Sequence, residues 1–134
     1  MAIMIDSNII LDVVLKDPIW SEWSSEKLKE FVNNDTLIIN SIIYSEVSIG
    51  FEEIEQVEAL FTPAYFSREP IPWEACFLAG KCFLQYRKKG GVKTNPLPDF
   101  FIGSHALVRG YPLLTRDKAR YKTYFPRLQL ISPE

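Results

Sequence analysis

The sequence has few of the residues that bind soft metals or form disulfides. Its 134 residues include two cysteines, Cys76 and Cys82, and a single histidine, His105. The cysteines stand apart in a helical pattern, so they form neither a metal knuckle nor a redox pair, and we expect reduced, packed thiols in a cytosolic protein. Because the chain has no second histidine, we interpret His105 as a packing residue rather than a metal ligand.

Long apolar runs are also absent. No run approaches the about 18 residues that a membrane-spanning helix needs, and the apolar N-terminal stretch is too short for a leader and lacks its basic start. We therefore expect no membrane segment and a location in the cytoplasm. The length suits one domain with its own core, and no repeat or linker divides it, so residues 1–134 are expected to form a single domain.

The net charge of −2 is small but unevenly distributed. Residues 1–70 hold 4 basic and 13 acidic side chains, whereas residues 71–134 hold 11 basic and 4 acidic ones. The basic C-terminal half suits contact with a phosphate backbone. Solvated charge on helix faces explains the same pattern, so charge alone leaves nucleic-acid binding open.

Short apolar runs alternate with helical patterns along the chain. Strands are expected within 2–8 and at 36–39, 66–71, 111–115 and 128–131, and helices at 9–15, 21–33, 41–50, 52–60, 73–89, 98–110 and 119–123. This alternation predicts an α/β fold, a three-layer α/β/α sandwich with a mostly parallel central sheet. In the longest helix, the residues expected to face the core are Trp73, Cys76, Phe77, Phe83 and Leu84.

Four acids stand where such a fold places chemistry. Asp6 and Asp117 follow apolar strands, Glu46 lies on the apolar stripe of its helix, and Asp99 lies in the first turn of a helix that begins at Pro98. Each has a simpler explanation, such as a helix cap at Asp6 or access to water at the rim for Glu46. Ligand sites of parallel sheets lie beyond the carboxyl ends of the strands, however, and all four acids are expected at that edge.

Carboxylates gathered within a few ångströms repel one another unless they are protonated or bridged by a cation. A site of oxygen ligands, without histidine or thiolate, suits Mg²⁺ or Mn²⁺ rather than zinc. Such an ion lowers the pKa of bound water and neutralises charge that develops on a phosphoryl group. The residues therefore predict a metal-dependent phosphodiesterase.

The same residues carry a family resemblance. The chain resembles PIN-domain ribonucleases of the VapC toxin type over essentially its full length, through Ile5-Asp6-Ser7-Asn8, Ser45-Glu46, Pro98-Asp99 and Leu113-Leu114-Thr115-Arg116-Asp117, with Tyr121 and Tyr124-Phe125-Pro126 behind. The resemblance implies a metal-dependent endoribonuclease from a toxin–antitoxin pair. It also implies RNA as the substrate, a small antitoxin and a second copy of the chain as partners, and an acidic cluster of Asp6, Glu46, Asp99 and Asp117.

Roles follow for the individual residues. Asp6 and Asp99 are expected to bind the main ion, with Asp117 completing the site, while Glu46 positions or deprotonates the attacking water. The residues that match the family's supporting polar positions are Asn8 and Thr115. Candidates for contact with the RNA backbone are Arg87, Lys93, Arg116 and Lys118. An arginine from the antitoxin is expected to pair with the carboxylates and compete with the metal.

The chain also departs from the family pattern. Ser7 stands where threonine is frequent, Gly103-Ser104 replaces the usual alanines, and Arg120 stands where some members have another acid, which puts a second metal site in doubt. Two alternatives remain open. One is a phosphatase of the haloacid-dehalogenase type, although it needs a second acid where Asn8 stands; the other is a non-catalytic domain that binds RNA or a partner.

Overall fold

The computed structural model describes residues 1–93 and 97–134, so the loop expected at 92–97 lies partly outside the described residues. The strands are β1 (Ala2–Ile5), β2 (Thr36–Ile39), β3 (Phe66–Arg68), β4 (Leu113–Leu114) and β5 (Leu130–Ile131). The helices are α1 (Ser7–Val14), α2 (Ser21–Val32), α3 (Ser41–Ser48), α4 (Ile54–Leu60), α5 (Trp73–Lys88), α6 (Pro98–Arg109) and α7 (Lys118–Tyr124).

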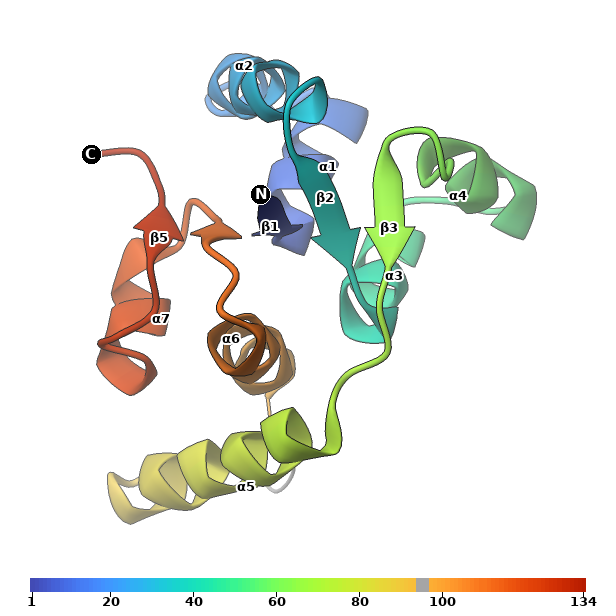
Figure 1. The fold of residues 1–134 in the computed structure, drawn as a ribbon. Helices are drawn as coiled ribbons and strands as arrows, with labels where there is room; N and C mark the ends of the chain where they lie inside the picture. The colour runs from blue at the N-terminus through green and yellow to red at the C-terminus, as the bar shows by residue number, and fades with distance from the viewer. Residues whose placement is uncertain (94–96) are drawn as a thin grey trace.

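The strands form one sheet of order β3-β2-β1-β4-β5 (Figure 1). Every neighbouring pair in it is parallel. In the central strand β1, Met4 pairs with Ile38 of β2 on one side and with Leu113 of β4 on the other. Residues 3–5 are fully buried, as a continuous apolar run in a covered parallel strand requires. The carboxyl ends of these strands meet at one edge, and Asp6 follows β1 at that edge.

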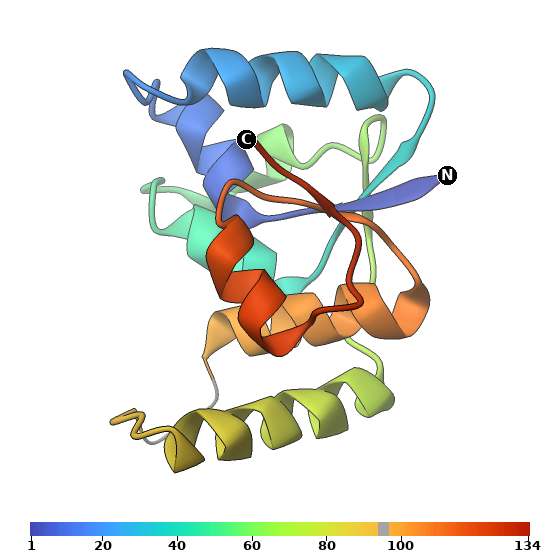
Figure 2. The same ribbon diagram turned by 90° about the vertical axis from the view of Figure 1, so that its left-hand side faces the viewer.

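Helices cover both faces of the sheet. Helices α1 and α2 lie on one side, and α6 lies on the other with α5 packed beyond it (Figures 1 and 2). The expected three-layer α/β/α sandwich is therefore confirmed, and its sheet is parallel throughout the described residues. Within that same part of the chain, no helix is long and apolar enough to cross a membrane.

The expected core face of α5 is wrong for three of its five residues, whereas Cys76 and Phe83 are half-buried and Phe83 packs against the core. The side chains of Trp73, Phe77 and Leu84 are 86%, 68% and 47% exposed, and the residues of α5 that are buried are Ala75, Ala79 and Cys82. Because α5 packs on α6 and not directly on the sheet (Figure 2), it needs only a narrow contact stripe. Small side chains allow the two helices to approach, and Trp73, Phe77 and Leu84 remain on the outside.

Helix α6 carries Asp99 in its first turn, and both its ends and its packing are well defined. It begins at Pro98, as expected, because proline suits a first turn whose N–H group has no partner. It ends at Gly110, whose φ of 73° is left-handed. A Cβ added to Gly103 would lie 2.4 Å from the ring of Phe125. A glycine at this position therefore lets α6 pack directly against that ring.

Candidate metal centre

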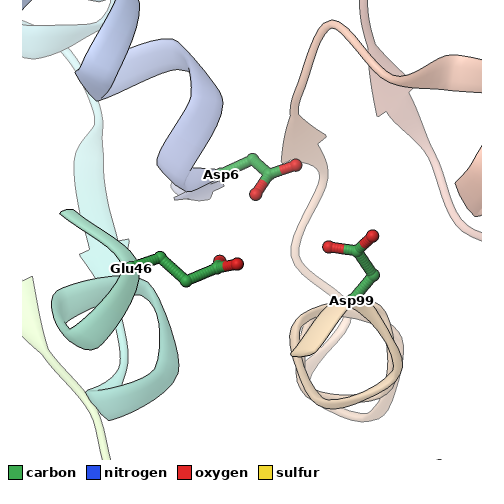
Figure 3. A group of neighbouring side chains, drawn as sticks. All are labelled: Asp6, Glu46 and Asp99. Carbon is green, nitrogen blue, oxygen red and sulfur yellow. The ribbon is translucent and has the colours of Figure 1, made fainter. Parts of the chain in front are cut away.

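Three of the four predicted acids meet at the carboxyl edge of the sheet. Asp6 comes from the end of β1, Glu46 from α3 and Asp99 from the first turn of α6. Their carboxylates point toward one another (Figure 3), and one oxygen of each lies within 4.8 Å of the others. Asp6 is buried, and the other two are half-buried. Residues 40 or more positions apart in the sequence thus form one compact group of oxygen atoms.

Asp6 is both a helix cap and a member of this group. Its Oδ1 accepts a hydrogen bond of 2.8 Å from the backbone N–H of Ser7 at the start of α1. Its Oδ2 accepts one of 2.7 Å from the Thr115 hydroxyl and one of 3.3 Å from the Asn8 amide. Asn8 also donates to Thr115 over 3.3 Å. Asn8, predicted to support the first acid, therefore contacts Asp6 directly, and so does Thr115, predicted as the hydroxyl residue before the last acid.

The carboxylates destabilise one another in their charged forms. Burial raises the pKa of Asp6 to about 7 against the opposing hydrogen bond from Thr115, and the nearby charges of Asp99 and Glu46 raise it further. Burial also raises the pKa of Glu46, with a further contribution from Asp99. A cation bound among the three oxygens would relieve this repulsion. Because every donor is a carboxylate oxygen, the residues fit Mg²⁺ or Mn²⁺.

Two further residues, Ser7 and Tyr121, form hydrogen bonds to the acids that the sequence did not predict. The Ser7 hydroxyl donates a 2.9 Å hydrogen bond to Oε1 of Glu46, so Ser7 orients a carboxylate as well as beginning a helix. The Tyr121 hydroxyl donates over 3.2 Å to Oδ1 of Asp99, although Tyr121 is almost fully buried. The one sequence signal for either contact was position: Ser7 follows the first acid, and Tyr121 follows the last.

The fourth acid, Asp117, is not brought into the three-carboxylate group that the described residues form. Its side chain is 39% exposed, and its Oδ2 lies 3.3 Å from Nε of Arg120. The same guanidinium donates from Nη1 to Oδ2 of Asp99 over 2.5 Å. Asp117 is therefore linked to the cluster through an arginine, and its expected role in completing the metal site stays a prediction.

The four cations predicted to contact RNA lie in different surroundings. Lys93 lines a cavity of about 440 Å³ together with Glu46, Asp99 and Arg120. Arg87 donates to the backbone carbonyl of Lys93 over 3.0 Å and so holds the chain after α5. Lys118 is exposed at the start of α7. Lys93 is thus the predicted cation that lies beside the carboxylates.

Arg116, the remaining candidate, has a structural partner. Its Nε and Nη2 donate to the two carboxylate oxygens of Asp12 over 2.8 and 2.9 Å. Asp12 is 2% exposed and also accepts a hydrogen bond from Ser24 of α2. The guanidinium of Arg116 therefore neutralises a buried acid. Its expected contact with RNA stays a prediction, because its positive charge is already paired with Asp12.

Comparison with known proteins identifies the family. The model of the PIN domain matches residues 3–126. The chain belongs to the PIN-domain family. This confirms the family predicted from the residues around the acids, and it places the three-carboxylate group within a known domain. A search of curated proteins found no match.

Solved structures share the fold of this PIN domain. A chain of VapBC2 from Rickettsia felis, bound to a promoter DNA fragment, is 24% identical with a TM-score of 0.74 over 100% of both chains. A chain of VapBC-1 from nontypeable Haemophilus influenzae is 24% identical with a TM-score of 0.71 over 98% of both. One from a Klebsiella pneumoniae toxin–antitoxin complex is 18% identical, with a TM-score of 0.68 over 98% of both.

Proposed function

We propose that this chain is a Mg²⁺- or Mn²⁺-dependent endoribonuclease that acts in the cytoplasm as the toxin of a toxin–antitoxin pair, with residues 1–134 as one nuclease domain. The observation that carries the proposal is the group formed by Asp6, Glu46 and Asp99, with oxygens within 4.8 Å of one another. A cavity that also contains Lys93 adjoins it and offers space and positive charge for a phosphate backbone.

Each residue then has a defined task. Asp6 and Asp99 hold the ion, and Asp117 assists from the rim. A bound Mg²⁺ or Mn²⁺ lowers the pKa of a water molecule and neutralises charge on the cleaved phosphodiester. Glu46, whose pKa is raised by burial, accepts the proton of the attacking water. Ser7 holds Glu46 in place through its 2.9 Å hydrogen bond, and Lys93 binds the RNA backbone.

The toxin role is supported by the family and by the assemblies in which similar folds occur, namely VapBC and toxin–antitoxin complexes. In this chain, large apolar side chains are exposed around α1, α3 and α4: Leu15 (60%), Ile19 (77%), Ile49 (86%) and Ile54 (64%). An amphipathic segment of an antitoxin can dock on such a surface. An arginine from that segment would then reach the acidic site.

A homodimer forms part of the proposal. The number of aromatic residues, with 3 Trp, 6 Tyr and 9 Phe, exceeds what one small core should hold and suggests that some lie at an interface. Trp73 and Phe77 stand one turn apart on α5 and are 86% and 68% exposed. Exposed apolar patches on small proteins mark interaction surfaces. The outer face of α5 is therefore the surface on which two copies would meet.

The test combines cleavage, metal dependence and growth. The purified chain should cleave RNA with Mg²⁺ or Mn²⁺, and it should lose activity in chelator and in Asp6→Asn or Asp99→Asn. Glu22→Gln, an exposed acid on α2, is the matched control and should retain activity. Expression of the wild type should slow growth, and co-expression with the antitoxin should restore it. Full activity in chelator would refute the chemistry, and unimpaired growth with active protein would refute the toxin role.

One observation favours a second candidate, a non-catalytic PIN domain that binds RNA or a partner. Arg120 pairs with Asp99 and Asp117, so part of the acidic charge is neutralised by the chain itself. Binding of RNA that is equal in wild type and Asp6→Asn, without cleavage by either, would support this candidate. The phosphatase alternative has no such support, because the PIN-domain model covers residues 3–126.

A further inference from the structure

Arg120 occupies an unusual place for a cation in a site expected to bind metal. It projects from α7, and its guanidinium contacts two predicted site acids, with Nη1 2.5 Å from Oδ2 of Asp99 and Nε 3.3 Å from Oδ2 of Asp117. Its side chain is 59% exposed, whereas that of Asp99 is 16% exposed. The arginine therefore reaches in from solvent and ends at the oxygens of the cluster.

We propose that Arg120 is a tethered counter-ion of the acidic site, which competes with divalent metal for Asp99 and limits the site to one ion. The inference rests on the proposed metal centre and deepens it. It concerns the affinity of the site for metal and the number of ions bound, and both can be measured without RNA.

The hydrogen bonds of Asp99 show where the competition takes place. Oδ1 accepts from the buried Tyr121, and Oδ2 accepts from the exposed Arg120. An ion that takes an oxygen of Asp99 must share it with one of these donors or displace it. Tyr121 is held by packing on all sides and is 1% exposed, while Arg120 can turn into solvent. Of the two donors, Arg120 is therefore the one that a metal ion would displace.

The position of Asp117 accounts for the limit of one ion. Its carboxylate lies outside the group formed by Asp6, Glu46 and Asp99, so a second cation would draw on Asp117 for its ligands. The guanidinium of Arg120 already bridges the carboxylates of Asp99 and Asp117. A divalent ion placed there would meet a like charge at close range. Arg120 would thus keep a second divalent ion away from these two carboxylates.

The experiment measures Mn²⁺ binding by calorimetry and by electron paramagnetic resonance, in the absence of RNA and at a salt concentration that screens distant charges. The wild type should bind one ion. Arg120→Gln should bind at least about tenfold more tightly, because a charge-assisted hydrogen bond no longer has to be broken. Arg120→Glu should bind two ions, with the spectrum of a coupled pair. Arg127→Gln, which removes an exposed arginine elsewhere, is the control and should match the wild type.

The outcomes separate this inference from the proposed function. Mn²⁺ binding that follows the expected order, in a chain that cleaves no RNA, would uphold the role of Arg120 and refute the nuclease. Two ions in the wild type, or equal affinity in the wild type and Arg120→Gln, would overturn the inference whatever the activity. Arg120→Lys serves if Arg120→Gln does not fold: it keeps the charge but loses the second contact, and its affinity should lie above that of the wild type.

Discussion

The Thr115 hydroxyl donates a 2.7 Å hydrogen bond to Oδ2 of Asp6, which lies 109 positions earlier in the chain. The two residues follow adjacent parallel strands, β4 and β1, so the sheet itself brings them together. Thr115 is fully buried and also accepts a 3.0 Å hydrogen bond from the backbone N–H of Asp117. One hydroxyl thus supports the first acid and fixes the turn that carries the last.

Thr115→Val should therefore weaken metal binding and cleavage. The substitution keeps the shape of the side chain but removes the hydrogen bond that lowers the pKa of Asp6. A hydrogen bond to a charged group contributes about 1.5–3 kcal/mol, so the loss of activity should be about tenfold to a hundredfold. Titration of the cleavage rate with Mn²⁺ measures it. Thr115→Ser keeps the hydroxyl and should stay near the wild type; equal rates for the valine and serine variants would contradict the prediction.

The raised pKa of Asp6 predicts a pH dependence of stability in the metal-free protein. The folded carboxyl keeps its proton up to a pKa of about 7, whereas the unfolded one releases it near pH 4. Between these values the unfolded state binds fewer protons, so the contribution of Asp6 to the free energy of unfolding falls as pH rises from about 4 to about 7. Its total is at most on the order of a few kcal/mol.

Asp6→Asn isolates this contribution. Asparagine keeps the helix cap but carries no charge, so the variant should match the wild type near pH 4 and be more stable above pH 7. Denaturant unfolding of both proteins in chelator, at about pH 5 and about pH 8, gives the difference. A variant that is less stable than the wild type at the higher pH would refute the electrostatic description of the cluster.

Arg116→Gln should reduce stability rather than only RNA binding. Asp12 is 2% exposed and receives both hydrogen bonds of the guanidinium. Removal of the cation leaves a buried carboxylate without its partner, which costs about 3–5 kcal/mol. Thermal or denaturant unfolding measures the loss. The double variant Arg116→Gln with Asp12→Asn should recover part of it, and a single variant of unchanged stability would show that water already solvates Asp12.

Lys93→Ala should weaken RNA binding without a loss of stability, the opposite of the effect expected for Arg116→Gln. Lys93 lies in the cavity beside Glu46 and Asp99, and its side chain forms no ion pair among the described residues. Stability should therefore stay the same while RNA affinity falls. The slope of log affinity against log salt should decrease by about 0.7, as expected for one phosphate contact on single-stranded RNA. Lys122→Ala, on α7 outside this cavity, is the control and should match the wild type. An unchanged slope for Lys93→Ala would show that Lys93 does not contact the RNA backbone.

The outer face of α5 gives a prediction for assembly. Phe77→Ser, alone or with Trp73→Ser, should convert a dimer to a monomer at tens of micromolar, because these exposed side chains would be buried between two copies. Light scattering measures the change. Ile54→Ser removes an equally exposed apolar residue from α4 and should leave the dimer intact. A wild type that is monomeric at this concentration would refute the interface.

The sequence carried enough information to place three acids but not the fourth. Asp6 could be placed because it follows an apolar run that ends at a polar residue, and Glu46 and Asp99 because they lie on the inner faces of helices that border the same edge of the sheet, so these three acids could be grouped correctly. Asp117 follows β4 in a turn, and its carboxylate pairs with Arg120. Neither the conformation of this turn nor the ion pair follows from the spacing of apolar residues in the sequence.

The surroundings of α5 and of His105 also differ from those expected, because contacts with other elements determine them. Trp73, Phe77 and Leu84 of α5 are exposed against expectation, because the partner of α5 is another helix and the residues buried in α5 include Ala75 and Ala79. His105 is buried as expected, yet it is also hydrogen-bonded, with Asn40 3.0 Å from Nδ1 and Glu69 2.9 Å from Nε2. Its partners come from other elements, so its own helix gave no sign of them.

The order of the strands also decides when during synthesis this chain acquires its site. The central strand β1 is made first, but its neighbour β4 and the hydrogen bond from Thr115 become available only after residue 115 of the 134 has left the ribosome. Asp99 likewise belongs to a helix that follows three of the five strands. A nascent chain therefore carries Asp6 and Glu46 without the partners that complete the cluster. A nuclease built in this way would remain inert toward the RNA that encodes it until translation is nearly finished.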